Sequence, residues 1–324
     1  MKQTNDQPQT LLEAIRYFSD IDRCIDFMAH FRWAGGKAVC PRCSCPETYY
    51  LAKRRVWKCK GCYKQFSIKV GTIMEDSAIP LDKWLSAMWM IVNAKNGISS
   101  YEIQRAVGVA QKSAWFLLHR IRLAMQQGTF EKLGGDSGHV EVDETFIGGK
   151  ARNMHIAQRK RRITGTGGKD KTAVMGILER GGEVRTMVIG TRKKSELHAN
   201  VRKHVEAGSA LYSDELRSYN GLEGDYAHQV INHAVKYVDG QVHTNGIENF
   251  WSLLKRCIKG TYVSIEPFHL FRYLDEETYR YNMRKMNDAQ RFVLALQSIV
   301  GKRLTYKAVT GKDIKEARQN IPTV

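Results

Sequence analysis

The chain has 324 residues, of which 43% are apolar, enough for more than one folded domain with a buried core. Its 51 Lys and Arg exceed its 33 Asp and Glu and give a formal net charge of +18, so nucleic acid is the expected partner and a purely small-molecule enzyme is disfavoured. The longest apolar run, Trp84–Val92, is about half of what a bilayer span needs, and the polar N-terminus is unlike a secretory signal. We therefore expect no membrane partner and a cytoplasmic protein that associates with the nucleoid when bound to DNA.

Two cysteine pairs with CxxC spacing follow an N-terminal helical segment. They are Cys40 with Cys43 and Cys59 with Cys62. In a reducing compartment this spacing favours metal binding over disulfides. The fifteen residues between the pairs leave room for a hairpin that brings four thiolates to one tetrahedral Zn²⁺ ion. Cys45 is an alternative ligand in place of Cys43.

The surrounding residues predict a zinc ribbon within a domain of residues 1–70. A helix capped by Ser19 or Asp20 is expected first. Strand-like runs cover Thr48–Leu51, Val56–Lys58 and Phe66–Val70. A ribbon of this size depends on its metal to fold, and the zinc either serves only that purpose or also presents basic residues to DNA. The candidate DNA contacts here are Arg54, Arg55 and Lys58.

Residues 71–135 predict a helical region. Apolar residues of Leu81–Val92 have helical spacing, and Ser99 with Glu102 forms a capping box for the next helix. Gly108 then supplies a turn before a third helix. We interpret this region as a helix-turn-helix-like DNA-binding region, with an ordinary helical spacer as the alternative. The third helix is expected to expose Gln111, Lys112, Ser113, His119, Arg120 and Arg122, of which Lys112 and Arg120 are the candidate DNA contacts.

The pattern changes to strands and helices in residues 136–300. Strands are expected at His139–Ile147, Thr172–Leu178 and Val184–Ile189, then a helix at Lys194–Glu206 and a fourth strand from Ala210 that ends in Ser213 and Asp214. This is the opening order of an RNase H-like α/β fold, with a mixed sheet and flanking helices. Residues 301–324 are expected to form a C-terminal tail.

Three acids occupy related places in this domain. Asp143 lies inside the first strand, Asp214 at the end of the fourth, and Glu248 begins a later helix. If the two strands pair, the carboxylates meet and repel one another unless divalent cations neutralise them. Oxygen ligands suit Mg²⁺ or Mn²⁺, and a pair of such ions performs phosphodiester cleavage and joining. Taken singly, the acids could instead be a solvent-facing strand residue, an N-cap and a cap glutamate.

Basic residues surround these acids in the sequence. The loop Lys150–Lys171 holds eight Lys or Arg and one acid, and we expect it to become ordered on DNA phosphates, with a solvated linker as the alternative. On the helix that begins near Glu248, two lysines share the face of the carboxylate. The candidate DNA contacts are Arg159, Lys160, Arg161, Arg162, Lys255 and Lys259.

With these motifs the chain resembles zinc-ribbon insertion-sequence transposases of the DDE type, the ISXO-like group. The similarity covers CPRC and CKGC, GTIMEDSAIPLDKW, VEVDETFIGGK, YSDELRSY, HTNGIENFWSLLKRCIKGTY, FRYLDEETYRYNMR and KRLTYK. The resemblance implies that Asp143, Asp214 and Glu248 are the DDE triad and hold two Mg²⁺ or Mn²⁺ ions. His243 and Asn245 belong to the matching motif without an assigned role.

The resemblance also implies the reaction and the partners. The enzyme would cleave DNA at the ends of a mobile element and transfer the freed strands into target DNA. The ribbon and the helix-turn-helix-like region would recognise the terminal inverted repeats, and a homodimer or larger assembly is expected on DNA. Two other functions fit parts of the sequence: a zinc-ribbon transcription regulator with structural acids, and an RNase H-like nuclease.

Overall fold

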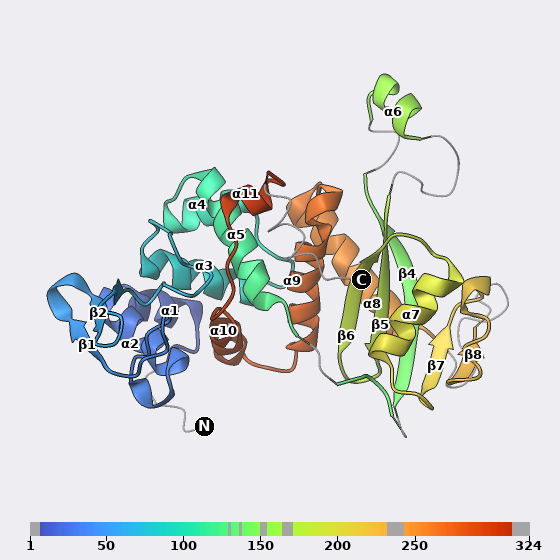
Figure 1. The fold of residues 1–324 in the computed structure, drawn as a ribbon. Coiled ribbons are helices and arrows are strands. Elements are labelled where there is room, and N and C mark those ends of the chain that lie inside the picture. Colours follow the sequence, from blue (N-terminus) through green and yellow to red (C-terminus); the bar gives the residue numbers. More distant parts are fainter. Residues whose placement is uncertain are drawn as a thin grey trace. The chain divides into compact units, whose positions relative to one another are not determined.

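The computed structural model describes residues 7–128, 131–135, 138–149, 154–163, 171–231 and 243–312. The chain divides into two compact units, Met1–Gln126 with Met283–Val324, and Gln127–Asn282 (Figure 1). Residues 283–300 thus group with the first unit, whereas the division based on sequence placed them in the catalytic domain. The functional labels of that division stay predictions. Among the described helices, none has the length and apolar character to cross a membrane.

The first unit consists of helices and a small antiparallel sheet. Its helices are α1 (Leu11–Phe18), α2 (Ile21–Arg32), α3 (Leu81–Asn93), α4 (Ser100–Val107), α5 (Gln111–Met125), α10 (Asp288–Gln297) and α11 (Tyr306–Val309). Its strands β1 (Thr48–Leu51), β2 (Val56–Cys59) and β3 (Gln65–Phe66) lie in that order. The ring of Phe292 on α10 packs against Phe18, Phe27 and Trp89. A late helix therefore completes the core of the N-terminal helices.

The capping signals in this unit act as expected. Asp20 accepts hydrogen bonds from the backbone N–H groups of Asp22 and Arg23 at the start of α2, at 2.8 and 3.3 Å. Ser99 and Glu102 form the capping box of α4. Gly108 ends that helix in the left-handed conformation, with φ of 63°, which a glycine adopts without steric cost.

The expected third ribbon strand, Phe66–Val70, is wrong in extent, because β3 ends at Phe66. The following residues form turns, with Val70 N–H donating to Ser67 and Thr72 N–H to Lys69. The guanidinium of Arg32 on α2 donates to the carbonyls of Ile68 and Val70, both at 2.5 Å. These two carbonyls therefore accept hydrogen bonds from an arginine side chain and not from a neighbouring strand.

The expected exposure of the third helix is also wrong at three positions. His119, Arg120 and Arg122 of α5 are buried, with exposed fractions of 1%, 5% and 1%. The Arg120 Nε donates to the carbonyl of Leu304 at 3.0 Å, and its guanidinium lies over the Phe116 ring. The C-terminal segment covers this face of α5, so Arg120 serves packing and is not available to DNA.

The second unit is a five-stranded mixed sheet with helices on its faces. Its strands are β4 (His139–Ile147), β5 (Thr172–Glu179), β6 (Val184–Ile189), β7 (Ala210–Ser213) and β8 (Ala227–Val230), in the order β6-β5-β4-β7-β8. Its helices are α6 (Ile156–Arg162), α7 (Lys194–His204), the 3₁₀-helix η4 (Arg217–Tyr219), α8 (Asn245–Cys257), the π-helix η5 (Ile258–Tyr262) and α9 (Leu270–Asn282). β4 pairs antiparallel with β5 and parallel with β7. The expected RNase H-like α/β fold is confirmed.

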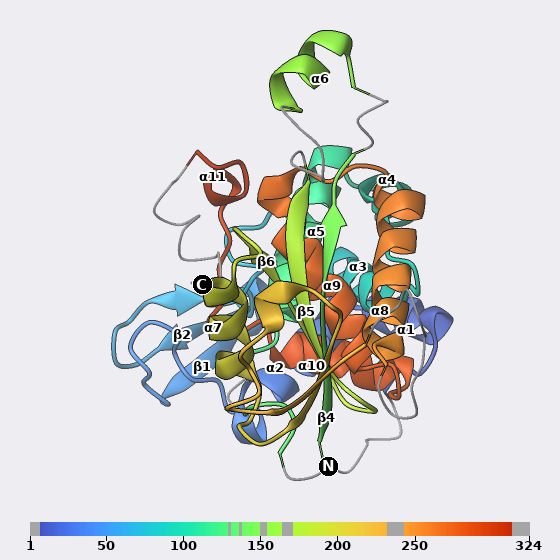
Figure 2. The ribbon, with the colours of Figure 1, turned by 90° about the vertical axis from the view of Figure 1, so that its right-hand side faces the viewer.

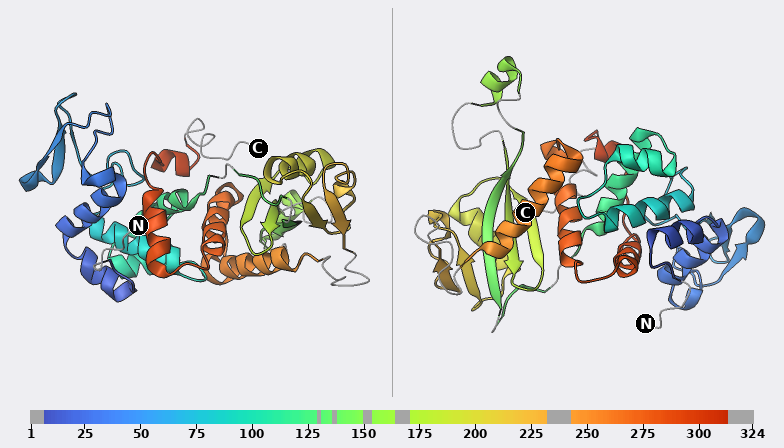
Figure 3. Two further views of the ribbon diagram at one scale, coloured as in Figure 1. Left: turned by 90° about the horizontal axis from the view of Figure 1, so that it is seen from below. Right: turned by 180° about the vertical axis from the view of Figure 1, so that it is seen from behind.

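The two faces of this sheet are covered by different helices. Val142 and Ile177 face a buried cluster that includes Leu197 and Val201 of α7. The opposite face packs against α8 through Ile247, Phe250, Trp251 and Leu254. Figure 2 shows α7 and α8 on opposite sides of the sheet, and Figure 3 shows α8 lying across its rear face. Side chains alternate between faces along a strand, so β4 presents Glu141 and Asp143 toward α8.

Gly176 allows α8 to lie close to the sheet. It is the β5 residue opposite Asp143. A Cβ atom at this position would lie 2.6 Å from the Trp251 ring and 2.7 Å from the Ile247 side chain. A side chain on β5 would therefore displace the helix from the strand that holds Asp143.

We predict that Gly176→Ala destabilises the second unit by about 1–3 kcal/mol, because the added methyl overpacks a filled interface. Denaturant unfolding followed by tryptophan fluorescence measures this change. The control is Gly224→Ala, where a Cβ has no neighbour within 4 Å and the change should stay within about 0.5 kcal/mol. Equal stabilities for the two variants would contradict the close packing of α8 on β5.

Candidate catalytic and metal sites

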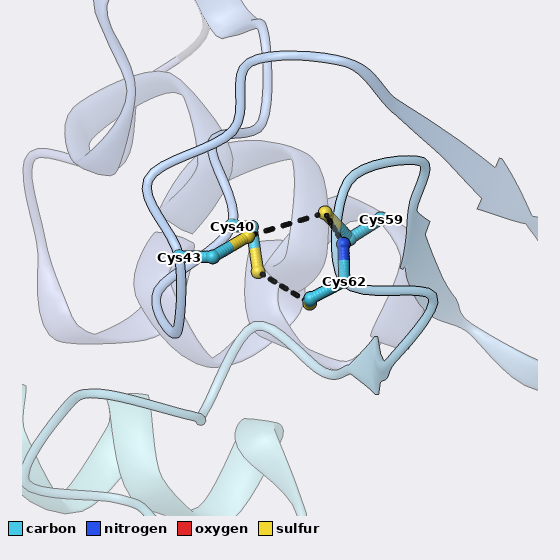
Figure 4. A group of neighbouring side chains, drawn as sticks. All are labelled: Cys40, Cys43, Cys59 and Cys62. Carbon is cyan, nitrogen blue, oxygen red and sulfur yellow. Dashed lines mark hydrogen bonds between the residues drawn. The ribbon is translucent and has the colours of Figure 1, made fainter.

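The four ribbon cysteines form one cluster in the first unit (Figure 4). Cys40 and Cys43 precede β1, and Cys59 and Cys62 lie at the end of β2 and in the turn after it. Their four Sγ atoms all lie within 4.8 Å of one another. The arrangement has the number, type and spacing of ligands that a structural Zn²⁺ site requires.

The second cysteine pair also has the hydrogen bonds of a metal knuckle. The N–H groups of Cys62 and Gly61 donate to the Cys59 Sγ at 3.4 and 3.2 Å. The Cys62 N–H, the Cys43 thiol and the Gly61 N–H lower the pKa of Cys59 to about 6 against the effect of burial. A thiolate is the form that binds metal. Cys45 is not part of the cluster and directs its Sγ toward the carbonyl of Glu47.

The first two acids lie on, or directly after, neighbouring strands of the large sheet. β4 and β7 run parallel, with Glu141 opposite Tyr212, and Asp143 and Asp214 each follow two residues later. The pKa of Asp143 is raised to about 6, first by burial and then by the negative charge of Asp214, with a smaller contribution from Glu248. Asp214 and Glu248 are therefore both near enough to Asp143 for their charges to affect its pKa.

Hydrogen bonds orient each of the three carboxylates. Asp143 accepts from the Glu144 N–H at 2.8 Å and from the Trp251 Nε1 at 2.9 Å. Asp214 accepts from the Leu216 N–H at 3.1 Å, and Glu248 accepts from the Thr244 hydroxyl at 3.0 Å. The interpretation of Asp214 as the N-cap of a helix near Glu215 is wrong, because the next helix, η4, begins at Arg217 and Asp214 instead accepts a backbone N–H within a turn. A carboxylate has about four acceptor positions, so these bonds are compatible with cation binding.

Another acid near this site, Glu144, is not a site residue predicted from the sequence. It points to the opposite face of the sheet from Asp143 and accepts a hydrogen bond from the Tyr219 hydroxyl. Burial raises its pKa to about 7, the Tyr219 hydrogen bond opposes this, and the charges of Asp143 and Asp214 add to it. Arg192 lowers it and stacks over the Phe146 ring at 4.7 Å. No local pattern in the sequence identifies Tyr219 as the partner.

The candidate DNA contacts have varied environments. Arg54, Lys112, Arg159, Lys160 and Lys259 are exposed, and Lys58 and Lys255 are half-buried. Arg55 is exposed but pairs with Asp22 through two bonds of 2.7 and 2.9 Å. The side chains of Arg161 and Arg162, and the glycine-rich part of the basic loop, lie outside the described residues.

Two family models match the chain. The ISXO2-like transposase domain covers residues 136–282 and the transposase zinc-ribbon domain covers residues 20–65. A curated "Uncharacterized transposase-like protein" of Haemophilus influenzae is 32% identical over 101 residues, which are 31% of this chain and 81% of the relative. The chain belongs to the ISXO2-like transposase family. The resemblance inferred from the motifs is thereby confirmed.

A longer match places the family in a mobile element. The "Uncharacterized protein in transposable element ISH50" of Halobacterium salinarum is 27% identical over 257 residues, or 75% of this chain and 85% of the relative. Together with the matched domains, this similarity supports an insertion-sequence transposase. The zinc-ribbon match and the four-cysteine cluster support Zn²⁺ as a cofactor.

We predict that Cys40→Ser reduces the zinc content from one ion per chain to a substoichiometric value, because it removes one of four thiolates. Metal analysis of the purified protein measures this. The matched control is Cys45→Ser, a neighbouring cysteine outside the cluster, which should retain the ion. Full zinc occupancy in Cys40→Ser would refute the ligand assignment.

The raised pKa of Asp143 predicts a pH dependence of stability in protein without added Mg²⁺ or Mn²⁺. The folded state holds the Asp143 proton up to about pH 6, whereas the usual pKa of an aspartate carboxyl is 3.8. The stabilising contribution is therefore complete below about pH 4 and is lost as the pH rises through about 6. Unfolding measured against pH should show this loss in the wild type and a smaller one in Asp143→Asn. Identical profiles would contradict the raised pKa.

Proposed function

We propose that Asp143, Asp214 and Glu248 are the DDE triad of this transposase, which cuts DNA at the ends of an insertion sequence and transfers the strands into target DNA. The observation that supports this most is the meeting of the acids at paired strands, with the pKa of Asp143 raised by the other two carboxylates as well as by burial. Such crowding is costly in a protein without a charged partner. Family membership is consistent with the same reaction.

The donor set fits hard divalent cations. All three side chains offer carboxylate oxygens, the ligands that Mg²⁺ and Mn²⁺ prefer. Two ions bound there would activate a hydroxyl nucleophile and stabilise the leaving oxygen of a phosphodiester.

The role of the protein side chains is to fix the ligands. Trp251 holds one oxygen of Asp143, and the Leu216 N–H holds one oxygen of Asp214. Thr244 restrains Glu248 within the first turn of α8. Each acid is thus held in one orientation by a bond from a different element, and this preorganisation favours reaction.

We propose double-stranded DNA as the partner, in the form of terminal inverted repeats and target sites. The net charge of +18 favours phosphate binding. The exposed Arg54, Lys112, Arg159, Lys160 and Lys259 are the best candidate contacts, and α4 and α5 with the turn at Gly108 are the proposed helix-turn-helix element. Because two element ends must be joined to one target, the active form is proposed to be a homodimer or larger assembly.

We predict that Asp143→Asn, Asp214→Asn and Glu248→Gln each reduce cleavage of a supercoiled plasmid bearing the element ends to the level without metal. The reason is that each variant removes one charged ligand while keeping the side-chain shape. Gel analysis of nicked, linear and joined products, with Mg²⁺ or Mn²⁺, measures this. Binding to the element ends should be retained in all three variants.

The matched control is Glu215→Gln, which neutralises an exposed acid next to Asp214 and should leave cleavage unchanged. Retained activity in Glu248→Gln would show that this glutamate is only a helix residue. Cleavage without joined products would favour the nuclease, and end binding without cleavage by the wild type would favour the transcription regulator.

A further inference from the structure

Glu141 is a buried acid of β4 that the proposed chemistry does not use. Its side chain has no exposed surface. It lies two residues before Asp143, on the same face of the strand, toward α8. A buried carboxylate is costly unless it is paired and hydrogen-bonded, so its partners reveal what it does.

The partners of Glu141 come from two distant segments. The Arg180 Nε, just after β5, donates to the Oε1 of Glu141 at 2.7 Å. The N–H of Ile247, in the first turn of α8, donates to the Oε2 at 2.9 Å. One carboxylate therefore connects β4, the end of β5 and the start of the helix that contains Glu248.

This bond replaces a local helix cap. The first N–H groups of a helix have no partner within it, and Thr244 at the N-cap makes no side-chain bond to them. Glu141 accepts one of these N–H groups from 106 residues away in sequence. Its negative charge also lies at the positive end of the helix dipole.

The chain before α8 is shaped around the same carboxylate. Arg180 donates to the carbonyl of His243 at 2.7 Å, and the His243 Nδ1 lies 3.4 Å from the Glu141 Oε1. A Cβ atom on Gly246 would lie 2.8 Å from the Glu141 Oε2. In the motif from His243 to Glu248, the histidine carbonyl accepts a hydrogen bond from Arg180, and Gly246 lets the backbone approach the Glu141 carboxylate. Glu248 follows two residues later.

We propose that Glu141, held by Arg180, is a positioning residue that fixes Glu248 relative to Asp143 in the cation site. The inference rests on the proposed function, since it assumes that these two acids share ions. Glu141 itself makes no bond to the ions. It acts by holding the first turn of α8 against the strand of Asp143, where small displacements separate the ligands.

The test is Mn²⁺ binding to the zinc-loaded protein without DNA, followed by electron paramagnetic resonance. Glu141→Gln keeps the shape of the side chain but loses the charge that pairs with Arg180. We predict that it weakens Mn²⁺ binding by about 10–100-fold, as for other groups that orient metal ligands. The Mg²⁺ concentration for half-maximal cleavage should rise in parallel, with end binding unchanged.

A matched control separates positioning from stability. Glu277 is also a buried glutamate of this unit and pairs with Arg280 at 2.5 Å. Glu277→Gln should lower the unfolding midpoint and leave Mn²⁺ affinity at the wild-type value. If Glu141→Gln does not fold, Gly246→Ala decides, because it changes no charge and should weaken Mn²⁺ binding by crowding Glu141.

The outcomes separate this inference from the proposed function. Wild-type Mn²⁺ affinity in a folded Glu141→Gln, or in Gly246→Ala where it is the deciding variant, would overturn the positioning role alone. If the wild type binds no more Mn²⁺ than Asp143→Asn, both the positioning role and the proposed function are overturned.

Discussion

The burial of Asp143 near two other acids is the constraint on which the proposed site depends. Asp143 and Asp214 lie near one another because β4 and β7 run parallel as neighbours, and Glu248 lies on α8, which packs against the same sheet. Burial and the neighbouring charges raise the pKa of Asp143 to about 6. Three features position α8 against the strand of Asp143: the glycine at position 176, the hydrogen bond from Trp251 to Asp143, and the hydrogen bond from the start of α8 to the buried Glu141 of β4.

Both units bring possible metal ligands close together, but the two ligand sets differ in type and in role. In the ribbon, four thiols within 4.8 Å offer a ligand set that stabilises the fold when Zn²⁺ is bound. In the second unit, buried clusters cover both faces of the sheet that contains Asp143. The metal thus stabilises the fold of the ribbon, whereas in the proposed mechanism the metal ions of the second unit take part in catalysis. This division explains why thiolates are found in the ribbon and carboxylates in the sheet.

Sequence reasoning succeeded where the signal was local or followed from strand order. The CxxC pairs, the capping box at Ser99 and the long strand around Asp143 were all predictable. It failed where a side chain is satisfied by a distant partner. Arg120 was expected at the surface and instead donates to Leu304, 184 residues away. Glu141 is joined to Arg180 and Ile247 at separations of 39 and 106 residues, so periodicity could show that it shares a face with Asp143 but not what it does there.

The central claim is that Asp143, Asp214 and Glu248 together bind the cations of a transposase site. Anomalous diffraction from crystals of the protein soaked with Mn²⁺ tests it most directly. The account predicts Mn²⁺ peaks at bonding distance from carboxylate oxygens of all three acids. Well-ordered acids with no Mn²⁺ peak between them, or a peak that leaves Glu248 uncoordinated, would contradict it.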